Sequence, residues 1–506
     1  MPLEYVFAIP LLIVFRYALI RCSNPLWSYL SAGPWGDAIC YFLQTQYYRR
    51  NSGAEVDPRC LFRGKTLHTP SWYQKLIGKF FSDSQLWSMP WLPNMVLYSI
   101  GIIAFLLVLA VFVNESSRML TLVAIIFSAQ ADNSRFDKLS IHYLTIQPRF
   151  LGLLSLSLYA LIFAAIPTPI VSGILGSLVL LVAINTSVFS RQVAYSVVPL
   201  TGLLAWDVTP IFHLLGATAL SLLVNKEEFV KSFQAQYRYT KWYFNNFYQT
   251  RPGTGLEYLI RKTFAPSLKD ISRYIDSLVA MVLLFIVLNE FDDPFARRCM
   301  SLIASAVVIC MLTAFRRFAS LGECWRYLSF YCYFVTPTAI AYCIIKSGTS
   351  NTLSYCLASV FLFYNLHRSF SNSEIEVNPL GDIHSMLNVL PNGSHQMAVW
   401  WSSHYRYGSI PVALGYGAST FEFQGTDLSE EAMKRFFANY PYLNYNEKFL
   451  DKYKVTHLLV SKKEWPENLY GPLANLIKDN RVLAENDNFV IMARATKPSF
   501  LHPDFA

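Results

Sequence analysis

The sequence carries little charge for its length. Of its 506 residues, only 15% are Asp, Glu, Lys or Arg, whereas about 25% is usual in soluble domains. Long apolar runs account for the deficit, and residues 95–113 alone are long enough to cross a bilayer core of about 30 Å. The composition excludes water-soluble fold classes and predicts a polytopic α-helical membrane protein.

Motifs of several soluble enzyme classes are also missing. The sequence holds no Walker motif, no dinucleotide-binding glycine pattern and no Gly-x-Ser-x-Gly elbow. Its nine cysteines lack metal-type spacing, and no basic run with interleaved aromatics indicates nucleic-acid binding. Cys40 and Cys60 share one loop, so a disulfide between them stays open for an oxidising compartment.

Eleven apolar windows predict membrane spans, the first of them a retained span without a cleavage site. The count is open by one or two, because Pro210 could kink one long helix instead of separating two. The windows lie near residues 4–21, 95–113, 118–130, 150–167, 170–188, 194–206, 209–224, 276–291, 298–315, 327–346 and 351–367.

The windows divide the chain into a transmembrane region, 1–368, and a tail, 369–506. Long segments near 22–94, 131–149 and 225–275 and the tail follow odd-numbered spans, so we expect all of them on one side. The positive-inside rule gives a mixed answer, and we favour the outer side because long loops largely escape that rule.

The tail predicts an extramembrane α/β domain. Residues 393–401, 455–461 and 488–495 are expected to be strands, and 429–440 and 466–480 helices. The tail has a net charge of −3 and the transmembrane region one of +12. The basic excess therefore belongs to the membrane part, where it suits contact with lipid phosphates.

Asp37 stands out because it follows a Gly-Pro-Trp-Gly turn directly after the first span. One interpretation is a helix cap that interacts with the helix dipole. The other is a general base at the membrane surface, since partial burial raises a carboxylate's pKa toward a useful value. Residues 38–50 are expected to form an amphipathic helix lying on the membrane.

The stretches "GPWGDAICYFLQTQYYRR" and "GKTLHTPSWY" between the first two spans resemble the first external loop of the GT-C superfamily of integral membrane glycosyltransferases. In that superfamily an acidic residue follows the first span, and Gly36-Asp37 match this feature. Ala38 stands where many members carry a second acid, which leaves metal ligands unknown and a divalent metal an open question.

The resemblance implies an inverting glycosyltransferase that moves a sugar from a polyprenyl phosphate to a cell-envelope glycan or glycolipid, such as O-antigen. The expected setting is a bacterial inner membrane with the active site facing the periplasm. Asp37 would be the base. The alternatives are a polymerase or ligase of lipid-linked glycans, or a transporter of them, although the lack of an internal repeat disfavours the transporter.

Further candidates accompany Asp37, each with a structural alternative. A second acidic position is expected at Asp132 or Asp137, which otherwise are loop residues. The lipid phosphate is expected to meet Arg149, Arg238, Lys241 and Arg251. The alternative for Arg149 is ordinary snorkelling, and the alternative for the other three is a cytoplasmic amphipathic helix that is basic for the usual topological reason. Acceptor or sugar contacts are expected at Trp35, His68, Trp72 and His404, of which His404 otherwise belongs to a surface turn after a strand.

Overall fold

The computed structural model describes residues 35–50, 70–112, 146–246, 293–314, 326–346, 379–390, 398–404, 407–419 and most of 442–495, with a few positions between 348 and 360. The chain divides into two compact units, which are described separately below. The first comprises Met1–Gly33 with Thr69–Ile375, and the second Pro34–His68 with Glu376–Ala506. The predicted spans 4–21, 118–130 and 276–291 fall outside the described residues.

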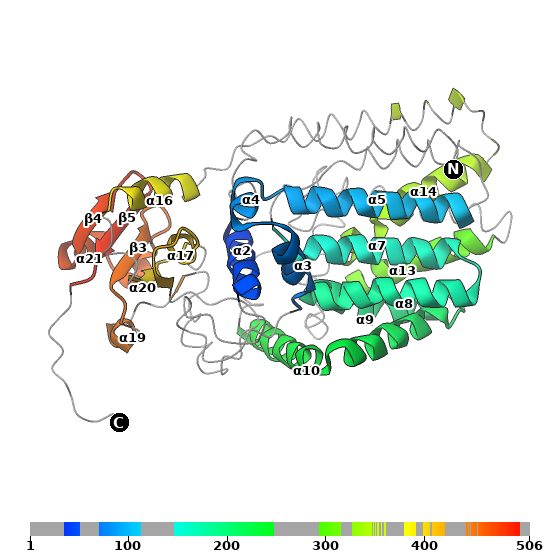
Figure 1. The fold of residues 1–506 in the computed structure, drawn as a ribbon, viewed down its shortest axis with the longest axis horizontal. Helices are drawn as coiled ribbons and strands as arrows, with labels where there is room; N and C mark the ends of the chain where they lie inside the picture. The colour runs from blue at the N-terminus through cyan, green and yellow to red at the C-terminus, as the bar shows by residue number, and fades with distance from the viewer. Residues whose placement is uncertain are drawn as a thin grey trace. The chain divides into compact units, whose positions relative to one another are not determined.

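The first unit is a bundle of helices (Figure 1). Its described helices are α3 (Trp72–Phe80), α4 (Asp83–Ser88), α5 (Leu92–Phe112), α7 (Pro148–Ala165), α8 (Pro169–Thr186), α9 (Val188–Ala205), α10 (Thr209–Asn246), α13 (Pro294–Ala314) and α14 (Arg326–Lys346). Within the described part of the chain, four of them (α5, α7, α8 and most of α13) are long and apolar enough to cross a membrane. The chain is therefore a polytopic α-helical membrane protein, and the count of eleven spans stays a prediction.

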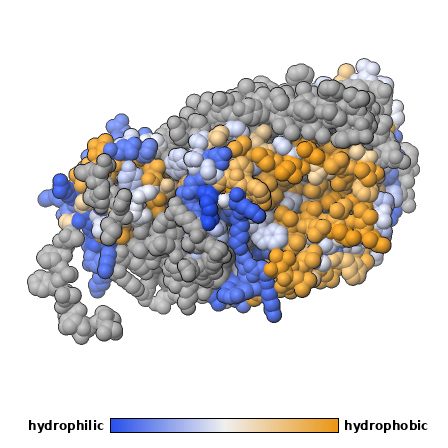
Figure 2. All heavy atoms as spheres, viewed as in Figure 1, coloured by the Kyte–Doolittle hydropathy of each residue, from blue (hydrophilic) through white to orange (hydrophobic). Residues whose placement is uncertain are grey.

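Helix α7 forms the centre of the bundle. It packs against α5, α8, α13 and α14, and 83% of its apolar window is buried. By contrast, α5, α8 and the first half of α10 expose apolar residues such as Ile100, Ile174 and Leu215. Figure 2 shows a broad hydrophobic surface on this face of the bundle. Such a surface suits contact with lipid chains, because lipid chains are as apolar as these side chains.

The ends of α9 and α10 follow from local sequence. Ser187 caps α9 by accepting a hydrogen bond from the backbone N–H of Ser190, so the helix begins six residues before the predicted window at 194. Trp206 ends it in the left-handed conformation, with φ of 53°. Pro210 is the second residue of the next helix. The alternative of one long helix kinked at Pro210 is therefore wrong.

A real kink lies further along α10. Asn225 has φ of −158° and ψ of 78°, and it divides the element into an apolar first half and a polar second half. The Asn225 side-chain oxygen accepts a hydrogen bond from the backbone N–H of Glu228, at 3.2 Å. Asn225 thus acts as an N-cap for the second half of the helix.

The second unit contains a five-stranded sheet in the order β2-β1-β3-β5-β4. β1 pairs in parallel with β2 and β3, and β5 is antiparallel to β3 and β4. The strands are β1 (Val399–Ser402), β2 (Ala418–Ser419), β3 (His457–Ser461), β4 (Arg481–Glu485) and β5 (Phe489–Ala493). β1, β3 and β5 confirm the three predicted strands.

Short helices accompany this sheet, namely α16 (Pro379–Asn388), α17 (Ile410–Ala413), α19 (Glu447–Lys452), α20 (Glu467–Tyr470) and α21 (Leu473–Asp479). The single helix predicted over 466–480 is wrong. It breaks into α20 and α21 because Gly471 has φ of +76° and Pro472 has no backbone N–H to donate. The helix predicted over 429–440 lies outside the described residues.

Helix α2 (Trp35–Arg50) comes from the first predicted loop but belongs to the second unit, where it contacts α17. It buries polar side chains such as Gln44 and Thr45 along with apolar ones such as Ile39 and Phe42. The prediction of a helix here is confirmed. The prediction that it is amphipathic is wrong, because its buried residues are not confined to one apolar face, and its place at the membrane stays a prediction.

Candidate functional site

Asp37 is the third residue of α2 and therefore lies in the first turn of that helix. A carboxylate in a first turn interacts favourably with the helix dipole, and the roles predicted for Asp37 stay predictions. Trp35 begins the same helix. Both residues belong to the second unit, together with the sheet.

The basic candidates lie in the first unit. Arg149 is the second residue of α7 and is half-buried, and Arg238 is exposed on the second half of α10, which also carries Lys241. The remaining candidates Asp132, Asp137, His68 and Arg251, together with Cys60, lie outside the described residues.

The described parts of three predicted loops meet at one end of the bundle. Helix α3, from the first loop, contacts α7 and α8. The Tyr73 hydroxyl donates to Asn94 Oδ1 at 2.7 Å and accepts from the backbone N–H of Gln147 at 3.3 Å, directly before α7. The second half of α10 begins at this same end, beside Ser71 and Lys75. The arrangement gathers polar groups at the boundary of the apolar bundle.

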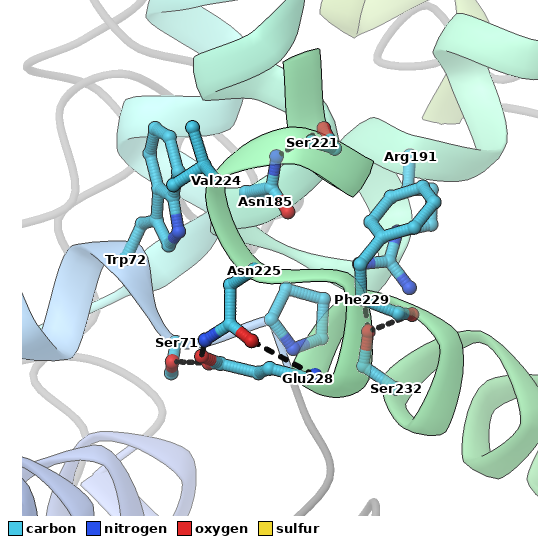
Figure 3. A pocket seen from close by; sticks show the side chains of 11 residues that line it. Ser71, Trp72, Asn185, Arg191, Ser221, Val224, Asn225, Glu228, Phe229 and Ser232 are labelled. Carbon is cyan, nitrogen blue, oxygen red and sulfur yellow. Dashed lines mark hydrogen bonds between the residues drawn. The ribbon is translucent and has the colours of Figure 1, made fainter. Parts of the chain in front are cut away.

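A pocket lies where these elements meet (Figure 3). Its walls come from the start of α3, the end of α8, the start of α9 and the kink of α10. The pocket is a small hollow that is open to solvent. The lining residues are Pro70, Ser71, Trp72, Asn185, Arg191, Ser221, Val224, Asn225, Glu228, Phe229 and Ser232.

The carboxylate of Glu228 is fully paired. Lys75 Nζ lies 2.9 Å from its Oε1 and 2.7 Å from its Oε2. The hydroxyl of Ser71 donates to Oε1, and the amide of Asn225 donates to Oε2 at 2.7 Å. Glu228 thereby ties α3 to the kink of α10, and its negative charge is balanced by Lys75.

Arg191 has no such balance. Its side chain is only 1% exposed, and it lies against the rings of Phe229 and Phe233, 5.2 and 4.9 Å from their centroids. Nε donates to the carbonyl of Ile184 at 2.8 Å, and Nη2 donates to the hydroxyl of Ser232 at 3.0 Å. Among the described residues, no carboxylate lies within ion-pair distance of its guanidinium. Hydrogen bonds and two aromatic rings therefore hold this buried cation, and none of its described partners is a carboxylate at ion-pair distance.

Sequence reasoning missed Arg191. It lies between two apolar windows, in a stretch that was assigned to neither span. The available signal was an arginine directly after a Ser cap and before an apolar run, but that pattern also describes an ordinary snorkelling side chain. Trp72, the first residue of α3, was predicted as a sugar or acceptor contact, and it lines the pocket with Arg191.

His404 follows β1 and is buried within the second unit. It forms an isolated bridge with Tyr442, and its ring lies 5.4 Å from that of Tyr407 and 5.8 Å from that of Tyr442, measured between centroids. It is only 6% exposed, and the neighbouring Trp400 and Trp401 are fully buried. The burial favours a structural role over an acceptor contact. The alternative prediction of a surface turn is wrong, because His404 packs against Tyr407 and Tyr442.

A second arginine lies at the opposite end of α7. Arg298, on α13, forms an ion pair with Asp207 at 3.1 Å and donates to the carbonyls of Phe163 and Ile166. Asp207 also accepts a hydrogen bond from the backbone N–H of Thr209. Among the described residues, no group of three His, Cys, Asp or Glu side chains could hold a metal ion. Asp132 and Asp137, the predicted second acids, lie outside the described residues, so a metal site there stays an open question.

No protein-family model and no curated protein matches the sequence. Among solved structures, ArnT from Cupriavidus metallidurans bound to undecaprenyl phosphate is similar, with a TM-score of 0.55 at 10% identity, over 97% of this chain and 98% of that chain. An oligosaccharyltransferase from Archaeoglobus fulgidus in complex with Zn and sulfate has a TM-score of 0.49 at 11% identity, over 89% of this chain and 68% of that chain. The ArnT match shows a shared fold over nearly the full length of both chains.

Proposed function

We propose that the chain is an integral membrane glycosyltransferase that takes a sugar from a polyprenyl phosphate. The observation that carries the proposal is the similarity of fold to ArnT, which extends over nearly the full length of both chains. That structure contains undecaprenyl phosphate. Helices that are arranged in the same way could bind a lipid-linked donor in this chain too. A fold does not define a reaction, so the chemistry has to come from residues of this chain.

In the proposed reaction, Asp37 takes the proton from a hydroxyl of the acceptor. The hydroxyl oxygen forms a bond to the anomeric carbon, and the bond from that carbon to the phosphate oxygen breaks. The phosphate leaves with the electron pair on its lipid, and attack from the opposite face inverts the anomeric centre. Basic residues stabilise the phosphate as its charge develops, and the candidates are Arg149, Arg238, Lys241 and Arg251.

The proposed acceptor is a cell-envelope glycan or glycolipid such as O-antigen, at the periplasmic face of a bacterial inner membrane. The meeting of three loop segments at one end of the bundle supports a working surface on one side. A polymerase or ligase of lipid-linked glycans remains the alternative, and it would use arginines without an aspartate base.

The test is Asp37→Asn in the purified full-length chain, reconstituted in nanodiscs with a panel of undecaprenyl-phosphate sugars and a lipopolysaccharide acceptor. Release of undecaprenyl phosphate is measured by mass spectrometry. Loss of the base should lower turnover by about 10²-fold or more, while the thermal melting curve stays close to that of the wild type.

Asp83→Asn is the matched control, because Asp83 is also a first-turn carboxylate of a helix in the first predicted loop. We expect it to keep turnover. If Asp37→Asn also turns over like the wild type, Asp37 is not the base, and loss of turnover on substitution of the arginines alone would then identify the polymerase or ligase alternative.

A further inference from the structure

His213 is an ionisable residue buried inside the membrane bundle. It is the fifth residue of α10, at the end of the bundle that lies away from the pocket, and only 1% of its surface is exposed. Among the described residues, neither of its ring nitrogens has a hydrogen-bond partner. A neutral imidazole carries one donor and one acceptor, so the described fold leaves two buried polar atoms unsatisfied at this position.

The ring fits closely between α7 and α8. It lies edge-on to Tyr159 of α7, with 5.8 Å between the ring centroids. On α8, a Cβ added at Gly176 would lie 2.7 Å from Nδ1 of His213, so the glycine leaves room for the imidazole. A buried polar group without a partner typically costs about 1–3 kcal/mol, and an apolar side chain of similar size would avoid that cost. Core packing alone therefore does not account for a histidine here.

An ion pair lies about one helical turn from the ring. Asp207, directly before α10, pairs with Arg298 of α13 at 3.1 Å. Arg298 also donates to the carbonyl of Phe163, one turn beyond Tyr159 on α7. Both charges of the pair act on the imidazole of His213. The histidine is therefore placed where a change in its own charge would act on the ion pair.

Few other ionisable groups are close to the ring. Among the described residues, those that face it are Tyr159 from α7, Asp207 from the α9–α10 turn and Arg298 from α13, and α8 carries none. The ionisable side chains of α9, Arg191 and Tyr195, lie at the other end of that helix, in its first two turns and the start of the third. A proton bound to the ring would therefore add a second cation beside a single carboxylate.

We propose that His213 makes this end of the bundle sensitive to pH. A proton from water binds a ring nitrogen, the imidazolium competes with Arg298 for the carboxylate of Asp207, and the junction of α13 with the α9–α10 turn loosens. Both side chains of the ion pair keep over a fifth of their surface exposed, which lets protons reach this end. The inference does not depend on the proposed function.

The direction of the effect follows from where the proton is costly. A histidine side chain in water has a pKa of about 6.5, so the unfolded chain takes up the proton below that pH at little cost. In the fold the same charge would be buried beside a second cation. Stability is therefore fully present at neutral pH and is lost as the pH falls through this range.

The experiment measures the melting temperature of the purified full-length chain in detergent micelles at about pH 7.5 and about pH 5.5, on either side of that pKa. We expect the wild type to melt several degrees lower at the acidic pH. His213→Gln keeps a polar side chain but takes up no proton, so it should lose at least half of this difference. His384→Gln is the matched control, because His384 is an exposed histidine of α16, and it should keep the whole difference.

His213→Leu guards against misfolding as the cause of a changed result. Leucine is close to histidine in volume and removes both unsatisfied nitrogens, so this variant should melt above the wild type at neutral pH and show little pH difference. A damaged fold would melt lower. An undiminished pH difference in both His213 variants, or its loss in His384→Gln, would overturn the proposal.

Arg298→Met tests the competition for Asp207. Without Arg298, a protonated His213 becomes the nearest described cation for that carboxylate, so acid should lower the melting temperature of this variant less than that of the wild type, or raise it. In the double variant His213→Gln/Arg298→Met this relief should disappear, which separates it from proton uptake by Asp207 itself. If Arg298→Met keeps the full wild-type difference, His213 does not act through the ion pair and the proposal is wrong.

Discussion

Arg191 and Arg298 lie at opposite ends of the same helical bundle and have similar neighbours, with one exception. Each donates to backbone carbonyls and lies over a phenylalanine ring. Arg298 also meets the carboxylate of Asp207 at 3.1 Å. Arg191 meets a serine and a glutamine, and among the described residues no carboxylate. Among the described residues, Arg298 therefore has a carboxylate partner and Arg191 has only neutral partners.

The difference separates an end of the bundle that an ion pair closes from an end where a buried arginine lies beside a pocket. The pair Arg298–Asp207 joins α13 to the α9–α10 turn and satisfies the last carbonyls of α7. Arg191 lies at a pocket formed where three loop segments meet. A partly buried ion pair is sensitive to the loss of either partner, whereas a cation held by neutral partners leaves no opposite charge behind when it is replaced.

The largest effect on stability is expected for Arg298→Met. It leaves Asp207 mostly buried and without its ion pair, and it removes two hydrogen bonds from the end of α7. Breaking a buried pair on one side typically costs about 3–5 kcal/mol, and the low end applies because both side chains keep over a fifth of their surface exposed. A thermal melt in detergent measures this loss. The double variant Arg298→Met/Asp207→Leu should recover part of it, and no recovery would show that the pair itself is unimportant.

Arg191→Met should change stability much less than Arg298→Met. The change removes hydrogen bonds to Ile184 and Ser232, but it also removes an uncompensated charge and leaves an apolar side chain beside Phe229 and Phe233. The two contributions nearly cancel, so we expect a difference within about 1 kcal/mol. The same melt measures it. A loss of stability as large as that of Arg298→Met would show that the hydrogen bonds of Arg191 matter to the fold as much as the Arg298–Asp207 ion pair does.

The transmembrane helices could be predicted from the sequence, while the way they are joined could not. The windows 150–167 and 170–188 agree with α7 and α8 to within two residues at each end, because apolar length alone defines a span. The start of α9 was missed because polar residues interrupt its first turns, although Ser190 and Arg191 make hydrogen bonds inside the bundle. Hydropathy reports composition and carries no information about such partners.

The candidate site shows the same limit. The resemblance to a superfamily led to Asp37, and its helix was predicted correctly. That α2 packs with the tail, whose elements begin more than three hundred residues later, depends on contacts that no local pattern encodes. The pocket depends equally on the kink at Asn225, which sets Glu228 opposite Lys75 and leaves Arg191 unpaired. The burial of Arg191 and the pairing of Lys75 with Glu228 can be seen only in the folded chain.

The smallest effect is expected for Lys75→Gln. The Lys75 side chain is 43% exposed, and ion pairs of this kind contribute about 0–1 kcal/mol, so the melting curve should barely move. The substitution nevertheless leaves the charge of Glu228 unbalanced beside the pocket. Glu228 keeps its hydrogen bonds from Ser71 and Asn225, so the small loss of stability should be seen at low ionic strength and fade in 1 M salt, where charges are screened beyond about 3 Å. A loss at low salt as large as that of Arg298→Met would show that the Lys75–Glu228 pair holds α3 to α10, and the contrast between the two ends of the bundle would then fail.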